Sequence, residues 1–238
     1  MSAQEFSPAG YRALIAAFAA RGYEPRGFAD ADPTARHLVL RHDVDFSLAA
    51  ALVMAEAEAE QGIEASYFIL LRTEFYNPLS GEGLKALERI AARHTIGLHF
   101  DAELYAGDPG ALDAAAAREC DLLGQVIGRS VELVSYHRPG ALRGGDAERL
   151  GGRLNVYAPR FVTAMGYCSD SRGGWHHGPP LDHAAIRAGR ALQLLVHPFW
   201  WQAPALAPEV RLQRFLAERG TFLDRELARH CSVHTAKP

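Results

Sequence analysis

Short apolar runs alternate with Ala-rich or amphipathic segments along most of the chain. The apolar runs predict buried strands at residues 38–40, 66–71, 95–100, 131–136, 161–167 and 192–197. The other segments predict helices at residues 13–20, 47–61, 81–93, 109–127, 208–219 and 222–230. Strands that alternate with helices are typical of parallel βαβ units. The sequence therefore predicts an α/β fold.

The chain shows no internal repeat of fixed period and no low-complexity linker. With 238 residues, of which 48% are hydrophobic, it is long enough to bury one sizeable core. We therefore expect a single domain over residues 1–238. Within this domain, residues 1–36 form an N-terminal helical extension, and residues 38–201 form the core that carries the motifs.

Charge and composition argue against several classes of partner. The formal net charge is −3 at pH 7, which does not fit the basic surface of a nucleic-acid-binding protein or a polybasic membrane anchor. No apolar run reaches the length of about 18 residues that a transmembrane helix needs, and no secretory signal is predicted. The three cysteines are odd in number and far apart, which favours a reducing compartment. We expect a cytoplasmic protein with no transmembrane segment and no nucleic-acid partner.

Polar residues follow the predicted strands at the point where each strand ends. The carboxyl ends of parallel strands meet at one edge of a sheet, where α/β proteins place their active sites. A single AspXAsp or His at a strand end is commonly a structural residue, but convergence from five strands favours a shared site. The residues at these ends are Asp43 and Asp45, His99 with Asp101 and Glu103, His137 with Arg138, Asp170, and His197.

Asp43 and Asp45 are the most informative pair in this set. Residues i and i+2 of an extended strand point to the same side, so the two carboxylates can share one pocket. Two carboxylates at such a separation repel each other unless a cation or a proton lies between them. The pair therefore predicts a metal site.

The order of these motifs resembles that of the polysaccharide deacetylase (NodB-homology) family of carbohydrate esterases, over roughly residues 38–201. RHDVD (41–45) resembles the family's aspartate pair, EASYF (64–68) its next strand, and HTIGLHF (94–100) its second motif. SYHRPG (135–140), SDSRGGW (169–175) and LLVHP (194–198) resemble its third, fourth and fifth motifs. The resemblance implies an irregular (β/α)7-type barrel.

The resemblance also implies roles for individual residues. Asp43 is implied as general base, Asp45 and His99 as metal ligands, and His197 as general acid. A histidine that must be cationic needs an anionic neighbour, and Asp170 is the candidate. Trp175 and Trp200 are expected to form an apolar wall for a sugar ring, and Glu103 is a further candidate substrate contact.

Two positions depart from the family pattern. Glu103 stands where the second motif normally supplies another ligand, and His137 occupies the usual arginine position of the third motif. We expect His137 to be the third metal ligand and Arg138 to steer Asp43, with Asp101 and Glu103 as the competing third ligands. One carboxylate and two imidazoles suit a divalent metal, with Zn²⁺ expected and Co²⁺ or Fe²⁺ as alternatives.

Together these features predict a metal-dependent hydrolase that removes an N-acetyl or N-formyl group from a sugar. The expected substrate is a small sugar, or a nucleotide-linked or lipid-linked saccharide used in surface polysaccharide biosynthesis. Two other functions are compatible with the sequence. One is a catalytically inactive, deacetylase-like saccharide-binding protein, which Glu103 at the ligand position would favour. The other is an amidohydrolase that acts on a non-sugar amide.

Overall fold

The computed structural model describes residues 6–105, 109–138 and 147–236. Its α-helices are α1 (Pro8–Ala19), α2 (Leu48–Ala59), α3 (Gly81–Ala91), α4 (Pro109–Ile127), α5 (Pro159–Val162), α6 (Ala184–Arg187) and α7 (Pro208–His230). Short 3₁₀ helices are η1 (Ala102–Tyr105), η3 (Ser171–Gly173), η4 (Pro180–Asp182) and η5 (Pro198–Trp201). The strands are β1 (Glu24–Pro25), β2 (His37–Val44), β3 (Ser66–Ile69), β4 (Thr95–Asp101), β5 (Leu133–His137), β6 (Arg149–Leu150), β7 (Arg153–Asn155), β8 (Gly166–Ser169) and β9 (Leu192–Val196).

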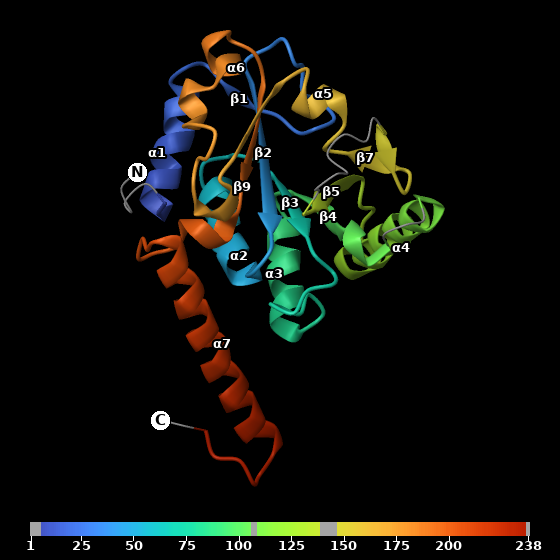
Figure 1. The fold of residues 1–238 in the computed structure, drawn as a ribbon, viewed down its shortest axis with the longest axis vertical. Helices are drawn as coiled ribbons and strands as arrows, with labels where there is room; N and C mark the ends of the chain where they lie inside the picture. The colour runs from blue at the N-terminus through green and yellow to red at the C-terminus, as the bar shows by residue number, and fades with distance from the viewer. Residues whose placement is uncertain (1–5, 106–108, 139–146, 237–238) are drawn as a thin grey trace.

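The strands form one curled sheet in the order β6-β7-β5-β4-β3-β2-β9-β8, with β1 paired to β2. All pairs are parallel except β6 with β7. Helices α2, α3 and α4 follow one another along the outside of the sheet (Figure 1). The predicted α/β barrel is therefore confirmed, as a half-barrel in which no described pairing joins β8 to β6.

Strand β2 lies near the middle of the sheet and is longer than the apolar run that predicted it. Its residues 38–44 are all buried, polar ones included, because strands pair with it on both edges and helices cover its outer face. The strand therefore continues through Arg41 and Asp43, which places functional side chains inside the sheet. Ser47 caps the helix that follows, since its side chain accepts a hydrogen bond from the backbone N–H of Ala50.

Two predicted elements differ from the structure. The expected strand at residues 161–167 is replaced by helix α5 and strand β8. Pro159 at the first position of α5 has the backbone angle that a helix start requires, so the buried Phe161 belongs to a helical turn. The helices expected at residues 208–219 and 222–230 form the single helix α7, which continues through Gly220.

The outer face of β2 rests on a buried polar cluster around Glu58 of α2. The Glu58 carboxylate accepts hydrogen bonds from the hydroxyls of Tyr11 and Tyr67, the latter at 2.6 Å. It also lies 2.8 Å from His42 Nε2. The cluster joins α1, α2, β2 and β3, so the segment before residue 38 packs into the core. Burial acts to raise the pKa of Glu58, but His42 and the tyrosine hydroxyls hold it below its ordinary value.

None of the helices in the described part of the chain is long and apolar enough to cross a membrane.

Candidate metal centre and active site

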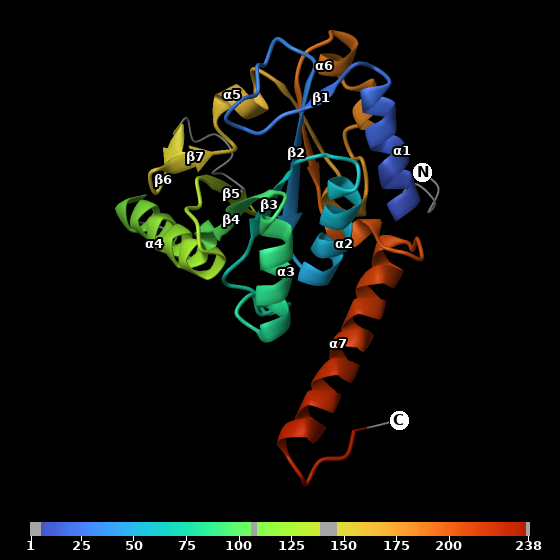
Figure 2. The same cartoon turned by 180° about the vertical axis from the view of Figure 1, so that it is seen from behind.

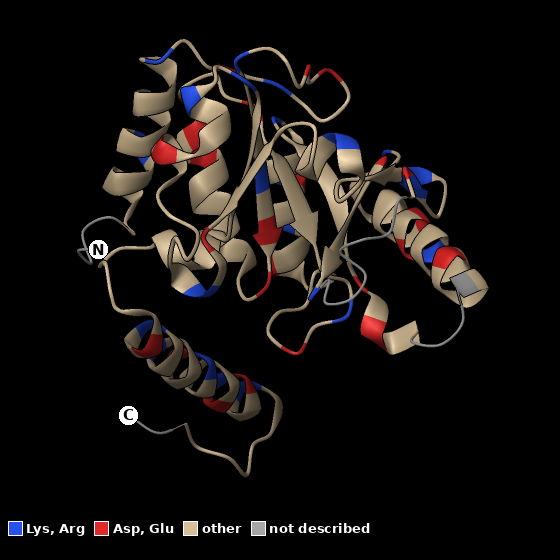
Figure 3. Cartoon of the chain, turned by 45° about the horizontal axis from the view of Figure 1, so that its top comes forward, with Lys and Arg blue, Asp and Glu red and all other residues tan. Residues whose placement is uncertain are grey.

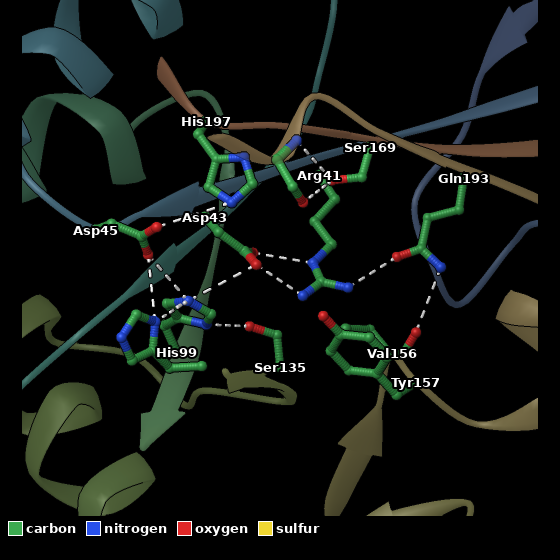
Figure 4. Close-up of polar contacts among 12 residues, drawn as sticks. Arg41, Asp43, Asp45, His99, Ser135, Val156, Tyr157, Ser169, Gln193 and His197 are labelled. Carbon is green, nitrogen blue, oxygen red and sulfur yellow. Dashed lines mark hydrogen bonds and ion pairs between the residues drawn. The ribbon is translucent and has the colours of Figure 1, made fainter. Parts of the chain in front are cut away.

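The candidate site lies inside the curled sheet, at the carboxyl ends of its strands (Figure 4). Alternation along β2 points Arg41, Asp43 and, just beyond the strand, Asp45 to this inner side. His42 points to the opposite face, onto Glu58. Side chains from β4, β5 and the end of β9 complete the site, so segments far apart in the sequence meet at one rim.

Asp45, His99 and His137 bring three ligand atoms together, all within 4.8 Å of one another. Asp45 Oδ1 lies 3.2 Å from His99 Nε2 and 3.5 Å from His137 Nδ1. The two imidazole nitrogens are 3.2 Å apart. Ligands in tetrahedral zinc sites with bonds of about 2.0–2.2 Å are about 3.3–3.6 Å from one another. The three separations in this triad lie in this range or within about 0.1 Å of it, as a tetrahedral site requires.

Two further features indicate that the triad fits a divalent cation. Asp45 Oδ1 is buried, and the polar atoms near it are the imidazole nitrogens of His99 and His137. His99 Nδ1 lies 2.6 Å from Ser135 Oγ, and an imidazole that donates there presents the Nε2 lone pair to the other ligands. Burial acts to raise the pKa of Asp45, but His137 and His99 hold it below its ordinary range. The triad therefore offers one carboxylate and two imidazoles, a set that suits Zn²⁺.

Asp43 lies beside the triad and is held by Arg41 of the same strand. The Arg41 guanidinium donates to both carboxylate oxygens, with distances of 2.9 Å to Oδ1 and 2.7 Å to Oδ2. Asp43 Oδ2 is 3.7 Å from His99 Nε2. Burial acts to raise the pKa of Asp43, but Arg41 lowers it below its ordinary value, so the side chain is anionic at neutral pH.

Arg41 is itself fully buried and fixed from its other side. Its Nη1 donates to Gln193 Oε1 at 3.1 Å, and its guanidinium lies 4.4 Å from the ring centre of Tyr157. Gln193 Nε2 donates in turn to the carbonyls of Val156 and Phe161. Both polar atoms of the Gln193 side chain are therefore hydrogen-bonded. Because the backbone holds Gln193, it also holds the guanidinium of Arg41 in one orientation.

His197 approaches the triad from the end of β9. Its Nδ1 lies 2.6 Å from Asp170 Oδ1, and its backbone N–H donates to the same carboxylate. Trp201 Nε1 donates to Asp170 Oδ2 at 2.6 Å, which fixes the carboxylate. Burial alone would lower the pKa of His197, but Asp170 raises it to about 9. The free nitrogen, Nε2, lies 3.8 Å from Asp45 Oδ2.

Arg138 lies elsewhere than the sequence predicted. It pairs with Asp101 at 2.6 Å and with Glu103 at 3.4 Å, whereas the guanidinium on Asp43 is that of Arg41. The residue has a left-handed backbone, with φ of 50°, and its side chain reaches Glu103 of η1. The competing candidates Asp101 and Glu103 are paired with Arg138, and the structure brings His137 to Asp45 and His99 instead.

The predicted substrate contacts lie mostly in packed surroundings. Trp175 and Trp200 are 5% and 7% exposed, and each packs against other aromatic rings, Trp175 on Phe6 and Trp200 on Phe46. Glu103 is exposed on η1, beside Arg138. The structure thus places Trp175 against Trp201 and Trp200 against Phe46 and Phe199, and it leaves Glu103 outside the triad.

Three residues that hold the site, Arg41, Gln193 and Ser135, were given no role in the sequence analysis. Arg41 and Asp43 have the i, i+2 spacing that puts both on one face of a strand, so this partnership had a local signal. Gln193 is the polar residue inside the apolar run 192–197, which is a second signal for a buried hydrogen-bonding role. Ser135 carries no such signal, because its partner His99 is 36 residues away in the chain.

The chain matches no protein-family model and no curated protein. Among solved structures, it is similar to the deacetylase PplD of Streptococcus pyogenes in complex with acetate, with 12% identity and a TM-score of 0.43, over 84% of this chain and 83% of that one. A family 4 carbohydrate esterase from Bacillus anthracis has 15% identity and a TM-score of 0.45, over 88% and 86%. A family 4 pseudoenzyme from Bacillus anthracis has 11% identity and a TM-score of 0.44, over 79% and 63%.

These structures are of the same class as the family that the sequence motifs resemble.

Proposed function

We propose that the protein is a metal-dependent hydrolase that removes an N-acetyl or N-formyl group from a sugar. The observation that carries this proposal is the triad, whose ligand atoms have tetrahedral separations, with Asp43 and His197 beside it. A carboxylate and an imidazolium near an open metal position are the groups that amide hydrolysis requires. The sugar is proposed from the motif resemblance.

Asp45, His99 and His137 are the proposed ligands, and Zn²⁺ is the proposed ion. When bound, such a cation supplies Lewis acidity that makes water a nucleophile near neutral pH. Ser135 would orient the His99 ring through Nδ1. Loss of the hydrogen-bond partner of a ligating histidine normally lowers metal affinity about 10–100-fold.

Asp43 is the proposed general base. It is anionic, buried, and held by two hydrogen bonds from Arg41, so its free lone pairs face the inner side of the sheet. Its Oδ2 would accept a proton from the attacking water. The pairing with Arg41 fixes the direction of the carboxylate, while it also weakens Asp43 as a base.

His197 is the proposed general acid. Its Nδ1 is occupied by Asp170, so the proton available for transfer is on Nε2, which points toward the triad. The pKa of about 9 keeps the ring protonated at neutral pH. Nε2 would deliver this proton to the amine nitrogen as the amide C–N bond breaks, which releases the acid and a free amino sugar.

The test is acetate release from N-acetylglucosamine oligosaccharides, measured together with the metal content of the purified protein. Asp43→Asn should lower the rate by about 10²–10⁴-fold, the usual contribution of a general base. Asp182→Asn, a change at an exposed aspartate, is the matched control and should leave the rate unchanged. Full activity in Asp43→Asn would remove Asp43 from the role of base.

The same assay separates the two other functions. Hydrolysis of non-sugar amides, with no release from any sugar, would support the amidohydrolase instead. A protein that binds metal and saccharide but releases no acetate would support the saccharide-binding protein. Among the described residues, His137 rather than Glu103 lies beside Asp45 and His99, which supports the proposed enzyme over the inactive protein.

A further inference from the structure

Helix α7 projects away from the rest of the molecule (Figures 1 and 2). Its 23 residues span about 34 Å at the α-helical rise of 1.5 Å per residue. Only its first turns are anchored. Arg211, the one buried residue of this fully described helix, donates to the carbonyls of Gln202 and Pro204, and Phe215 packs on Phe199.

The projecting part of α7 carries a row of large apolar side chains. Leu216 is 64% exposed, Phe222 41%, Leu223 50% and Leu227 56%. Spacings of seven and four residues place Leu216, Leu223 and Leu227 on one side of the helix, and Phe222 lies beside this row. Helices in proteins draw most of their stability from packing such a face, so this face is suited to contact with another protein surface.

Leu223 of this row also lines a groove between residues 215–226 of α7 and the segments around α2 and α3. The groove has a volume of about 680 Å³. Phe46, Phe75, Phe215, Phe222 and Leu223 contribute its apolar lining. Phe75 is 41% exposed there, so the exposed apolar surface extends beyond the helix itself.

The residues on either side of Leu223 suit an antiparallel pairing of two copies of α7. Arg219 and Gly220 lie four and three residues before Leu223, and Glu226 and Leu227 lie three and four residues after it. In an antiparallel pair of helices that cross at Leu223, Arg219 of each copy therefore lies beside Glu226 of the other. Leu227 of each copy faces Gly220 of the other.

Gly220 and the charges of α7 are compatible with such a close crossing. A Cβ placed on Gly220 would have no atom within 4 Å, so the space above this position is open. Glycine inside a helix costs about 0.5–1 kcal/mol relative to alanine, and a close helix crossing is a reason for it. Basic and acidic residues alternate along the helix (Figure 3), so two copies would not repel each other through a single sign of charge.

We propose that the exposed face of α7 binds the same face of a second copy of this chain, in an antiparallel, two-fold arrangement centred on Leu223. Such an interface uses one surface patch twice, as closed dimers do. The reciprocal Arg219–Glu226 pairs set the register, and Leu223 and Leu227 supply the apolar contact. The proposal is independent of the proposed enzymatic function.

The test is the molar mass of the full chain in solution, measured by light scattering across a dilution series. The wild type should have twice the chain mass of 26.0 kDa. Leu223→Arg should give the single-chain mass, since it puts two cations at the crossing. Val53→Arg is the matched control, because Val53 is 59% exposed on α2 and lies outside the α7 face. It should leave the dimer intact.

A charge exchange tests the register. Arg219→Glu and Glu226→Arg should each weaken the dimer, and the double exchange should restore it, with circular dichroism showing that all variants are folded. A monomeric wild type would overturn the proposal, as would a dimer that survives Leu223→Arg. Failure of the double exchange to restore association would overturn the antiparallel register.

Discussion

Replacing Asp170 by Asn should move the pH dependence of the hydrolase, because Asp170 is the group that raises the pKa of His197. The wild-type value is about 9. If the variant takes the pKa of a free imidazole, about 6.5, the pKa of His197 falls by about 2.5, which corresponds to roughly 3 kcal/mol. The pKa is raised, so the acid form is present below it and is lost as the pH rises through it.

The size of the effect on the rate follows from the protonated fraction of His197. At pH 8 this fraction falls from about 0.9 to about 0.03, which predicts a rate lower by roughly 30-fold. At pH 6 the ring is mostly protonated in both proteins, so the two rates should be similar there. A cation on the triad acts on both proteins alike, and the displacement between the two profiles is therefore the quantity to compare.

The assay is acetate release from N-acetylglucosamine oligosaccharides between pH 5 and pH 10, in steps of about half a unit, for both proteins. Circular dichroism checks that Asp170→Asn is folded, because Trp201 and the backbone N–H of His197 also bind this carboxylate. A variant that loses activity equally at every pH would refute the assigned link between Asp170 and the proton of His197. A basic limb of the pH–rate profile at the same pH in both proteins would also refute this link.

Further predictions concern the parts that hold the site. Ser135→Ala should weaken Zn²⁺ binding by about 10–100-fold in a competition assay with a chromogenic chelator, because it removes the partner of His99 Nδ1. Arg41→Met should lower the free energy of unfolding by about 3–5 kcal/mol in urea, since it leaves the Asp43 carboxylate buried and unpaired; a smaller loss than in Arg138→Met would contradict this. The lowered pKa of Glu58 means that its contribution to stability is present above the unfolded-state pKa of about 4.3 and is lost as the pH falls through the folded-state value. Glu58→Gln should therefore flatten the acid side of a stability profile measured by urea unfolding, and an unchanged acid slope would show that Glu58 is not responsible.

The sequence predicted the order of strands and helices because each carries a local signal. Apolar runs marked β2, β3, β4, β5 and β9, and polar residues at their ends marked the rim. The strand expected at residues 161–167 was wrong, because a four-residue helix begun by Pro159 has too few residues to show a helical period. The two helices predicted at residues 208–219 and 222–230 form one helix through Gly220, because a single glycine costs only about 1 kcal/mol in a helix and is tolerated.

The site was harder to predict where partners are distant in the chain. The sequence could bring Arg138 near Asp43 only by analogy of motifs, and in the structure Arg41 occupies that place. The neighbour of Arg41 that fixes it, Gln193, is 152 residues away, and only the pairing of β2 with β9 brings them together. The choice among His137, Asp101 and Glu103 likewise depends on the backbone turn at Arg138, which no local pattern reveals.

The most direct test of the central claim is an anomalous-scattering map of crystals grown with Zn²⁺. We expect one strong peak at bonding distance, about 2.0–2.2 Å, from Asp45 Oδ1, His99 Nε2 and His137 Nδ1. A peak held instead by Asp101 and Glu103, or no peak among these side chains at saturating Zn²⁺, would contradict the metal-dependent account.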